Sequence, residues 1–409
     1  MAAMLLAVVV VYYLVSLTVS LLNYKSRSDP VPENVKGIYD PRDYQRWLDY
    51  TMETFRLSVL VRTFTTAALV GALTTGLFGQ LEAWTQHWFD SGLWQAVAFV
   101  GVIYLVSFAA GLPVDYYKTF VIEERYGFNK TTRLTFVLDQ VKSLVLMGLL
   151  LTVVIAALYT LFAAFADNLW LFIVLVWIVI SMLTMVMFVL NTKVFVKVFN
   201  KLVRMEEGRL KNDIEALAAE VGFEVTAISV MDASRRSTKL NAFFSGLGRT
   251  REVVLYDTLV ERLSHDEILA VLAHEIGHAI HRDVPRMLAQ QIALLGVYSL
   301  VIGYVMQSSQ LAMGFGLQGV NFGFALVLSG IVMTAINLVV SIPVNYWRRR
   351  AEYQADAFAA RCVGKHHMAT ALRILARENF AHLTPHPAYV WLNYSHPPIA
   401  QRLAALETK

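Results

Sequence analysis

Seven long apolar stretches constrain this chain more than any other feature of its sequence. They are residues 3–23, 57–78, 94–114, 143–165, 169–192, 290–307 and 321–345. A helix needs about 20 mainly apolar residues to cross a bilayer, and each stretch comes close to that length. Hydrophobic residues make up 56% of the chain and charged residues only 16%, whereas soluble domains have about 25% charged residues. The sequence therefore predicts a polytopic α-helical membrane protein, with the lipid bilayer as one of its partners.

The basic residues predict how the spans are oriented. Every Lys and Arg lies in loops 24–56, 115–142 and 193–289, in the tail from residue 346, or at the membrane edge of these segments. Because Lys and Arg collect on the cytoplasmic side, the N-terminus is predicted outside and the large loops inside. Residues 3–23 are expected to be retained as a span, since Lys25 and Arg27 follow the apolar run instead of preceding it.

Composition also excludes several classes of site and partner. The net charge of +4 is explained by orientation in a membrane, and no nucleic acid is expected because the basic residues are not interleaved with aromatics on one face. One cysteine, Cys362, allows no internal disulfide and too few ligands for a Cys-based zinc site. The compact loops and the C-terminal Glu-Thr-Lys, which is not a dilysine signal, favour a bacterial inner membrane; in a eukaryote we expect the endoplasmic reticulum membrane. Oligomeric state is not predicted.

The spans divide the chain into four parts. Residues 1–199 form a five-span membrane region, 200–289 a cytoplasmic α+β segment, 290–345 the last two spans, and 346–409 a C-terminal cytoplasmic segment. Within 200–289 we expect a helix over 200–221, a strand over 223–232, and two strands over 240–257 around a Gly-Leu-Gly-Arg turn. Ser264 and Glu267 have the spacing of a capping box, which predicts a helix running to about His281.

That helix carries the sequence His274-Glu275-Ile276-Gly277-His278. Two histidines four apart lie on the same face of a helix, the spacing at which two imidazoles bind one Zn²⁺. Glu275 is placed to activate a water on this metal as a general base and later to protonate the leaving amine. A catalytic zinc site normally has three protein ligands, so a third ligand is expected elsewhere in the chain. His281 is expected to be a surface or supporting residue and not a further ligand.

The third ligand is expected in residues 348–362, directly after the seventh span. Glu352 and Asp356 are four apart there, beside Ala355 and Ala359, which indicates a helix packed closely on another. One carboxylate would bind the metal while the other orients a ligand histidine. Spacing alone does not decide which of the two is the ligand.

With these motifs the chain resembles the type I CAAX prenyl proteases, the a-factor-converting class of membrane zinc endopeptidases. The resemblance rests on VIEERYGFNKTT (121–132) with Asp139 and Lys142, LNAFFSGLG (240–248), AHEIGH (273–278), EYQAD (352–356) and YSHPPIAQRL (394–403). It implies seven spans around a water-filled chamber, a small zincin-like catalytic domain, and Glu352 as third ligand of one Zn²⁺ per chain, which leaves Asp356 to orient a histidine.

The resemblance further implies that Asn241, His396 and Arg402 line the cleft and hold the substrate backbone and the oxyanion. From the residues alone, Asn241 begins a strand with which an extended peptide can pair, and His396 is equally a turn residue before Pro397-Pro398. The expected substrate is a peptide or protein, with prenylated C-terminal CAAX sequences implied for eukaryotic members.

Three other functions compete with this hypothesis. An HtpX-like quality-control protease shares the two histidines and the later carboxylate but looks shorter and lacks the 121–132 block. A site-2-type protease would place its motif inside an apolar span. A transporter or scaffold would carry the motif by chance or bind zinc structurally.

Overall fold

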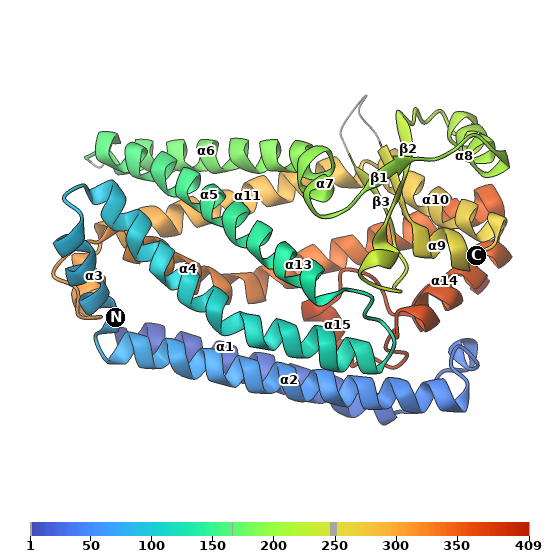
Figure 1. Cartoon of the computed structure of the whole chain (residues 1–409), viewed down its shortest axis with the longest axis horizontal. Helices are drawn as coiled ribbons and strands as arrows, with labels where there is room; N and C mark the ends of the chain where they lie inside the picture. Colours follow the sequence, from blue (N-terminus) through green and yellow to red (C-terminus); the bar gives the residue numbers. More distant parts are fainter. Residues whose placement is uncertain (1, 166, 246–251, 409) are drawn as a thin grey trace.

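Seven helices of the structure are long and apolar enough to cross a membrane, which confirms the predicted number of spans. The structure is a computed structural model that describes residues 2–165, 167–245 and 252–408 (Figure 1). The seven are α1 (Ala2–Lys25), α2 (Pro41–Thr74), α4 (Gly92–Tyr117), α5 (Arg133–Phe165), α6 (Leu169–Leu190), α11 (Asp283–Gln307) and α13 (Phe322–Val363). Two short helices, α3 (Leu77–Trp88) and α12 (Ser309–Met313), connect spans at the end where no basic residues lie.

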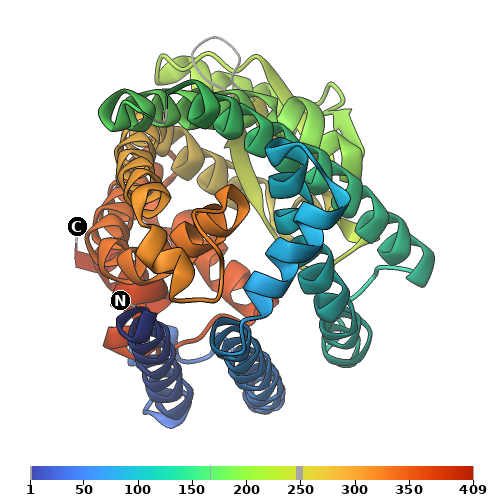
Figure 2. The same ribbon diagram turned by 90° about the vertical axis from the view of Figure 1, so that its left-hand side faces the viewer.

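The spans are arranged as a ring (Figure 2). Contacts run from α1 to α2, through α3 to α4, then to α5, α6, α11 and α13, and from α13 back to α1. In the apolar windows of the seven spans, only 6–22% of the residues are buried. At the end where α3 and α12 lie, buried residues of α4, α5, α6, α11 and α13 share one apolar core, and α4 also contacts α13 there.

The segment between α6 and α11 forms a four-stranded sheet with helices beside it. Its strands are β1 (Leu202–Arg204), β2 (Ala227–Met231), β3 (Ala242–Ser245) and β4 (Glu252–Tyr256), in the order β1-β2-β4-β3. β2 and β4 are parallel, whereas β1 and β3 pair antiparallel with their neighbours. The three strands predicted within 223–257 are confirmed, and the predicted Gly-Leu-Gly-Arg turn lies outside the described residues. β3 stands at one edge of the described sheet.

The helix predicted over 200–221 was wrong at its start. Helix α8 spans only Arg209–Glu220, while Leu202–Arg204 pair with β2 as strand β1. The spacing of apolar residues continues through this segment, but Gly208 directly precedes α8 with an extended backbone. Pairing with a distant strand overrides local helix preference here.

The close crossing of α10 (His265–Ile280) and α13 determines the site. Gly277 makes this crossing tight: a Cβ at that position would lie 3.1 Å from the Cα of Ala355. The predicted packing of the Ala-rich carboxylate helix is therefore confirmed. α13 continues without a break from the seventh span through Glu352, so the span and the site share one rigid element. Helices α14 (Lys365–Glu378), α15 (Pro387–Asn393) and α16 (Ile399–Thr408) complete the C-terminal part, and α9 (Asp257–Arg262) precedes α10; the three-residue α7 is Lys197–Phe199.

Candidate active site

Helix α10 presents His274 and His278 side by side. The predicted capping box is present: the Ser264 side chain and the Glu267 carboxylate each satisfy a main-chain N–H at the first turn. The two imidazoles lie one turn apart, with their Nε2 atoms 3.2 Å from each other. His274 is buried, and His278 is partly accessible.

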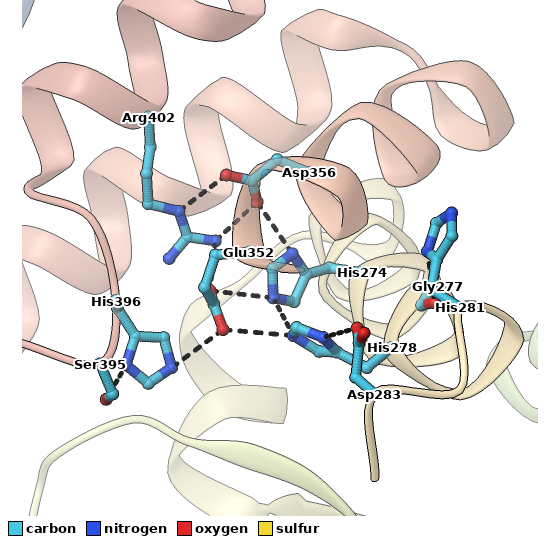
Figure 3. Close-up of polar contacts among 10 residues, drawn as sticks. All are labelled: His274, Gly277, His278, His281, Asp283, Glu352, Asp356, Ser395, His396 and Arg402. Atoms are coloured by element: carbon cyan, nitrogen blue, oxygen red, sulfur yellow. Dashed lines mark hydrogen bonds and ion pairs between the residues drawn. The ribbon is translucent and has the colours of Figure 1, made fainter. Parts of the chain in front are cut away.

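Glu352 reaches the same point from α13 (Figure 3). Its Oε2 lies 3.5 Å from His274 Nε2, and its Oε1 lies 3.2 Å from His278 Nε2. The three residues offer ligand atoms that all lie within 4.8 Å of one another. Helices α10 and α13, which are separated in sequence by α11 and α12, thus bring three metal-ligating groups together.

The residues present fit a zinc ion. Ligands at zinc–nitrogen and zinc–oxygen distances of about 2.0–2.1 Å stand about 3.3 Å apart at the corners of a tetrahedron. The two Nε2 atoms are 3.2 Å apart, and each lies 3.2–3.5 Å from a different oxygen of Glu352. Glu352 Oε2 is buried and has no hydrogen-bond partner among the described residues. Two imidazole nitrogens and an unsatisfied carboxylate oxygen facing one point form a donor set that a divalent cation would stabilise.

Two further carboxylates hold the outer nitrogens of the histidines. Asp356 Oδ1 lies 2.8 Å from His274 Nδ1, and Asp283 Oδ2 lies 2.9 Å from His278 Nδ1. Burial of each imidazole disfavours its charge, but these carboxylates and Glu352 outweigh burial and raise the pKa of both histidines above the ordinary value. A proton on each Nδ1 leaves each Nε2 with its lone pair directed at the metal position.

Asp283 was not predicted from the sequence as a residue of the site. It is the first residue of α11 and is buried. Arg282, which precedes it, has a φ of 56°, in the left-handed region that side chains rarely adopt. This tight turn folds Asp283 back onto His278. An acidic residue at a helix start with Pro285 in the same first turn is a helix-start signal that could have located it.

Asp283→Asn is expected to weaken metal binding about 10–100-fold while leaving the fold intact. The amide cannot hold a proton on His278 Nδ1 with the strength of a carboxylate. The dissociation constant of the metal, measured by competition with a chromogenic chelator, gives this change, and excess zinc should restore activity. Asp266→Asn, an exposed position on α10, is the control. Equal affinities in the wild type and Asp283→Asn would contradict the role given to Asp283.

Glu275 is not one of the three grouped ligands, but its carboxyl interacts electrostatically with all three of them. Its side chain is half-buried on α10. Burial raises the pKa of the Glu275 carboxyl, against the opposing effect of His274 and His278. A carboxyl with a raised pKa is suited to take a proton and to return it near neutral pH.

His396 and Arg402 lie on the opposite side of Glu352 from α10, in different situations. His396 is 64% exposed, with Nε2 3.2 Å from Glu352 Oε1 and Nδ1 2.9 Å from Ser395 Oγ. Arg402 is only 13% exposed, and its Nε and Nη2 donate to the two oxygens of Asp356 over 2.8 and 2.6 Å. His396 is thus free to meet a substrate, whereas Arg402 holds the carboxylate that holds His274.

The structure also gives the positions of Asn241 and His281. Asn241 is exposed at the start of β3, and its main-chain oxygen accepts a hydrogen bond from Tyr256 N. His281 caps the end of α10, with Nδ1 2.8 Å from the Gly277 carbonyl oxygen, and points away from Glu352 (Figure 3). The expectation that His281 is not a metal ligand agrees with this position.

The two halves of the chain match two family models. The model described as "CAAX prenyl protease N-terminal, five membrane helices" matches residues 20–201, and "Peptidase family M48" matches residues 204–409. The 121–132 block that an HtpX-like protease lacks lies within the first of these ranges, so the HtpX-like alternative is not favoured.

Curated relatives and a solved structure agree with these matches. The chain is 34% identical to CAAX prenyl protease 1 of Saccharomyces cerevisiae, over 76% of this chain and 72% of the relative. It is 30% identical to a CAAX prenyl protease 1 homolog of Oryza sativa subsp. japonica, over 92% of this chain and 90% of the relative. The crystal structure of S. mikatae Ste24p superposes with a TM-score of 0.93 and 26% identity, covering 99% of each chain.

Proposed function

This chain belongs to peptidase family M48 as a membrane metalloendopeptidase of the CAAX prenyl protease type, and we propose that its metal is one Zn²⁺ held by His274, His278 and Glu352. The observation that carries the proposal is the convergence of three ligand atoms from α10 and α13, which lie within 4.8 Å of one another. Asp356 and Asp283 keep the two histidines in the orientation that binding requires.

The proposed reaction is hydrolysis of a peptide bond by a water molecule. When bound, Zn²⁺ acts as a Lewis acid that polarises the scissile carbonyl and lowers the pKa of water. Glu275 takes a proton from the attacking water on its carboxylate and delivers it to the nitrogen of the leaving amine. His396, which is accessible beside Glu352, donates from Nε2 to the oxygen that gains charge.

Arg402 was expected to hold the substrate, and we keep this as a proposal beside its observed contact with Asp356. Both roles are compatible, since Arg402 lines the same cavity as His396, a cavity of about 430 Å³. In this position its positive charge also lies close to Glu352, with Nη2 3.6 Å from Oε2.

The substrate is proposed to bind as an extended strand along the outer edge of β3, beginning near Asn241. β3 is an edge strand of the described sheet, and α10 contacts it. An edge strand offers main-chain N–H and C=O groups that bind a peptide of almost any sequence. We propose peptides and proteins as substrates, prenylated C-terminal CAAX sequences among them, as the names of the relatives suggest.

For the site's location we propose the cytoplasmic side, with the N-terminus outside. The absence of Lys and Arg from 79–93, 166–168 and 308–320 supports this orientation. The bacterial inner membrane, or the endoplasmic reticulum in a eukaryote, stays the expected location. The four-part division at residues 199, 289 and 345, and the water-filled chamber within the ring, are likewise proposals.

The function is tested with the purified protein and a peptide library that contains one CAAX peptide in farnesylated and unmodified forms. We expect cleavage that a chelator abolishes and that added zinc restores, with the products identified by mass spectrometry. Faster cleavage of the farnesylated form would support the proposed substrate class. Cleavage that persists after complete metal removal would contradict the metal-dependent mechanism.

A further inference from the structure

The main-chain groups of β3 alternate between its two edges. Tyr256 N donates to the main-chain oxygen of Asn241, and the register pairs Ala242 with Leu255. In an antiparallel pair, residues whose N–H and C=O bond to the partner strand alternate with residues whose groups point away from it. Asn241 therefore faces β4, whereas the N–H and C=O of Leu240, Ala242 and Phe244 turn towards the outer edge.

Asn379 already occupies the first of these outer positions. Its Oδ1 accepts from Leu240 N over 2.9 Å, and its Nδ2 donates to the Leu240 main-chain oxygen over 3.0 Å. A primary amide that satisfies both main-chain groups of one residue mimics one residue of a pairing strand. Among the described residues, Ala242 has no such side-chain partner from another element, and its N–H donates to the side chain of the adjacent Asn241.

Asn379 is held firmly in this position. It ends helix α14, and the next residue, Phe380, has a φ of 53° although it is not a glycine. The Phe380 ring packs on Phe128 and Tyr50, with centroids 4.8 and 5.7 Å away. A non-glycine residue in the left-handed region is sparsely populated and persists only where surrounding contacts over-determine it.

The segment before Leu240 is held in the same way. Thr238 N donates to the Phe128 oxygen, and Lys130 N donates to the Arg236 oxygen. Lys239 Nζ lies 3.0 Å from Glu123 Oε2. The 121–132 block, which has no part in the metal site, thus fixes the start of β3 against the membrane region.

Asn379 also lies near two of the proposed substrate-binding residues. It lines the cavity of about 430 Å³ that His396 and Arg402 line. A peptide paired with β3 and passing the metal site would therefore reach Asn379 at one end of its paired stretch.

We propose that Asn379 is a positioning residue that sets the register of peptide substrates on β3. Because it occupies the outer edge at Leu240, a peptide pairs only from Ala242 onward, and a peptide whose end meets Asn379 presents one defined peptide bond to the metal site. This inference rests on the proposed binding of substrate along β3.

The test uses peptides with a uniform stretch of one residue, in which neighbouring bonds are chemically equivalent. The wild type is expected to cut one dominant bond. Asn379→Ala opens the edge at Leu240, and because outer groups recur at every second residue, a second product displaced by two residues should rise at least about tenfold. Asn379→Asp keeps the size of the side chain but not the donor to the Leu240 oxygen, and it should give the same displaced product.

The control is Asn212→Ala, an exposed position on α8 that does not line this cavity; its cleavage pattern should not change. Metal content and thermal unfolding show whether each variant is folded. A single unshifted cleavage bond in folded Asn379→Ala and Asn379→Asp would overturn the proposal, and so would a displacement by one residue.

A second measurement needs no variant. In the wild type, N-methylation of the peptide backbone should raise KM when the methyl group is on the residue that pairs with Ala242 or with Phe244. N-methylation of the residue that would lie opposite Leu240 should have no effect on KM. An equal rise in KM at that position would contradict the inference even if the variants do not fold. If the wild type cleaves no peptide at all, the proposed function fails first, independently of Asn379.

Discussion

Replacing Glu275 by glutamine is expected to lower kcat by about 10²–10⁴-fold while leaving the bound metal in place. Glutamine keeps the shape of the side chain but cannot accept the proton of the attacking water. Glu275 is not one of the three grouped ligands, so its loss should not release zinc. The two quantities to measure are kcat on a cleaved peptide and zinc content per chain.

The matched control is Glu267→Gln, on the same helix. Glu267 Oε2 accepts from Ser264 N over 2.7 Å in the capping box, and glutamine retains an acceptor oxygen. This variant should keep its zinc and its activity. Loss of zinc in Glu275→Gln, or full activity in it, would exclude the role of Glu275 as general base. If the chain were a transporter or scaffold instead, Glu275→Gln would leave transport or assembly unchanged.

Replacing Glu352 by alanine is expected to remove both zinc and activity. It deletes the carboxylate that lies 3.2 Å from His278 Nε2 and 3.5 Å from His274 Nε2. Two histidines alone do not make a catalytic zinc site, which normally has three protein ligands. The expected result is at least about a 100-fold loss of zinc affinity, measured by competition with a chelator.

Asp356→Asn is the informative comparison, because spacing alone left Glu352 and Asp356 as equal candidates. Asp356 contacts the outer nitrogen of His274 and is paired with Arg402. We expect a smaller loss of zinc affinity there, about 10–100-fold, with activity recovered in excess zinc. If Asp356→Asn lost more zinc than Glu352→Ala, Asp356 and not Glu352 would have to be the metal ligand.

The features that the sequence predicted correctly are those carried by local patterns. Apolar length predicted the seven spans, and the Ser264–Glu267 spacing predicted the start of α10. The four-residue spacing of His274 and His278 predicted that both lie on the same face of α10. Each depends on residues within one or two helical turns, where geometry follows directly from the period of the element.

Other features depend on contacts between distant segments, and local patterns do not report them. Strand β1 forms because Leu202–Arg204 meet β2, although the segment has the spacing of a helix. The extension of α13 to Val363 follows from a lack of helix breakers between residues 346 and 362, which the span prediction did not use. Asp283 and Asn379 are positioned by turns whose left-handed residues, Arg282 and Phe380, are not glycines, so glycine did not mark these turns; only the helix start at Asp283 had a local signal.

If α10 and α13 share one zinc ion, anomalous X-ray scattering from crystals of the purified protein, recorded on both sides of the zinc absorption edge, will reveal it. We expect a single strong zinc peak per chain, about 2.0–2.2 Å from His274 Nε2, His278 Nε2 and a Glu352 oxygen. A zinc-replete protein with no peak between these three residues, or with the Glu352 carboxylate turned away from it, would contradict the account.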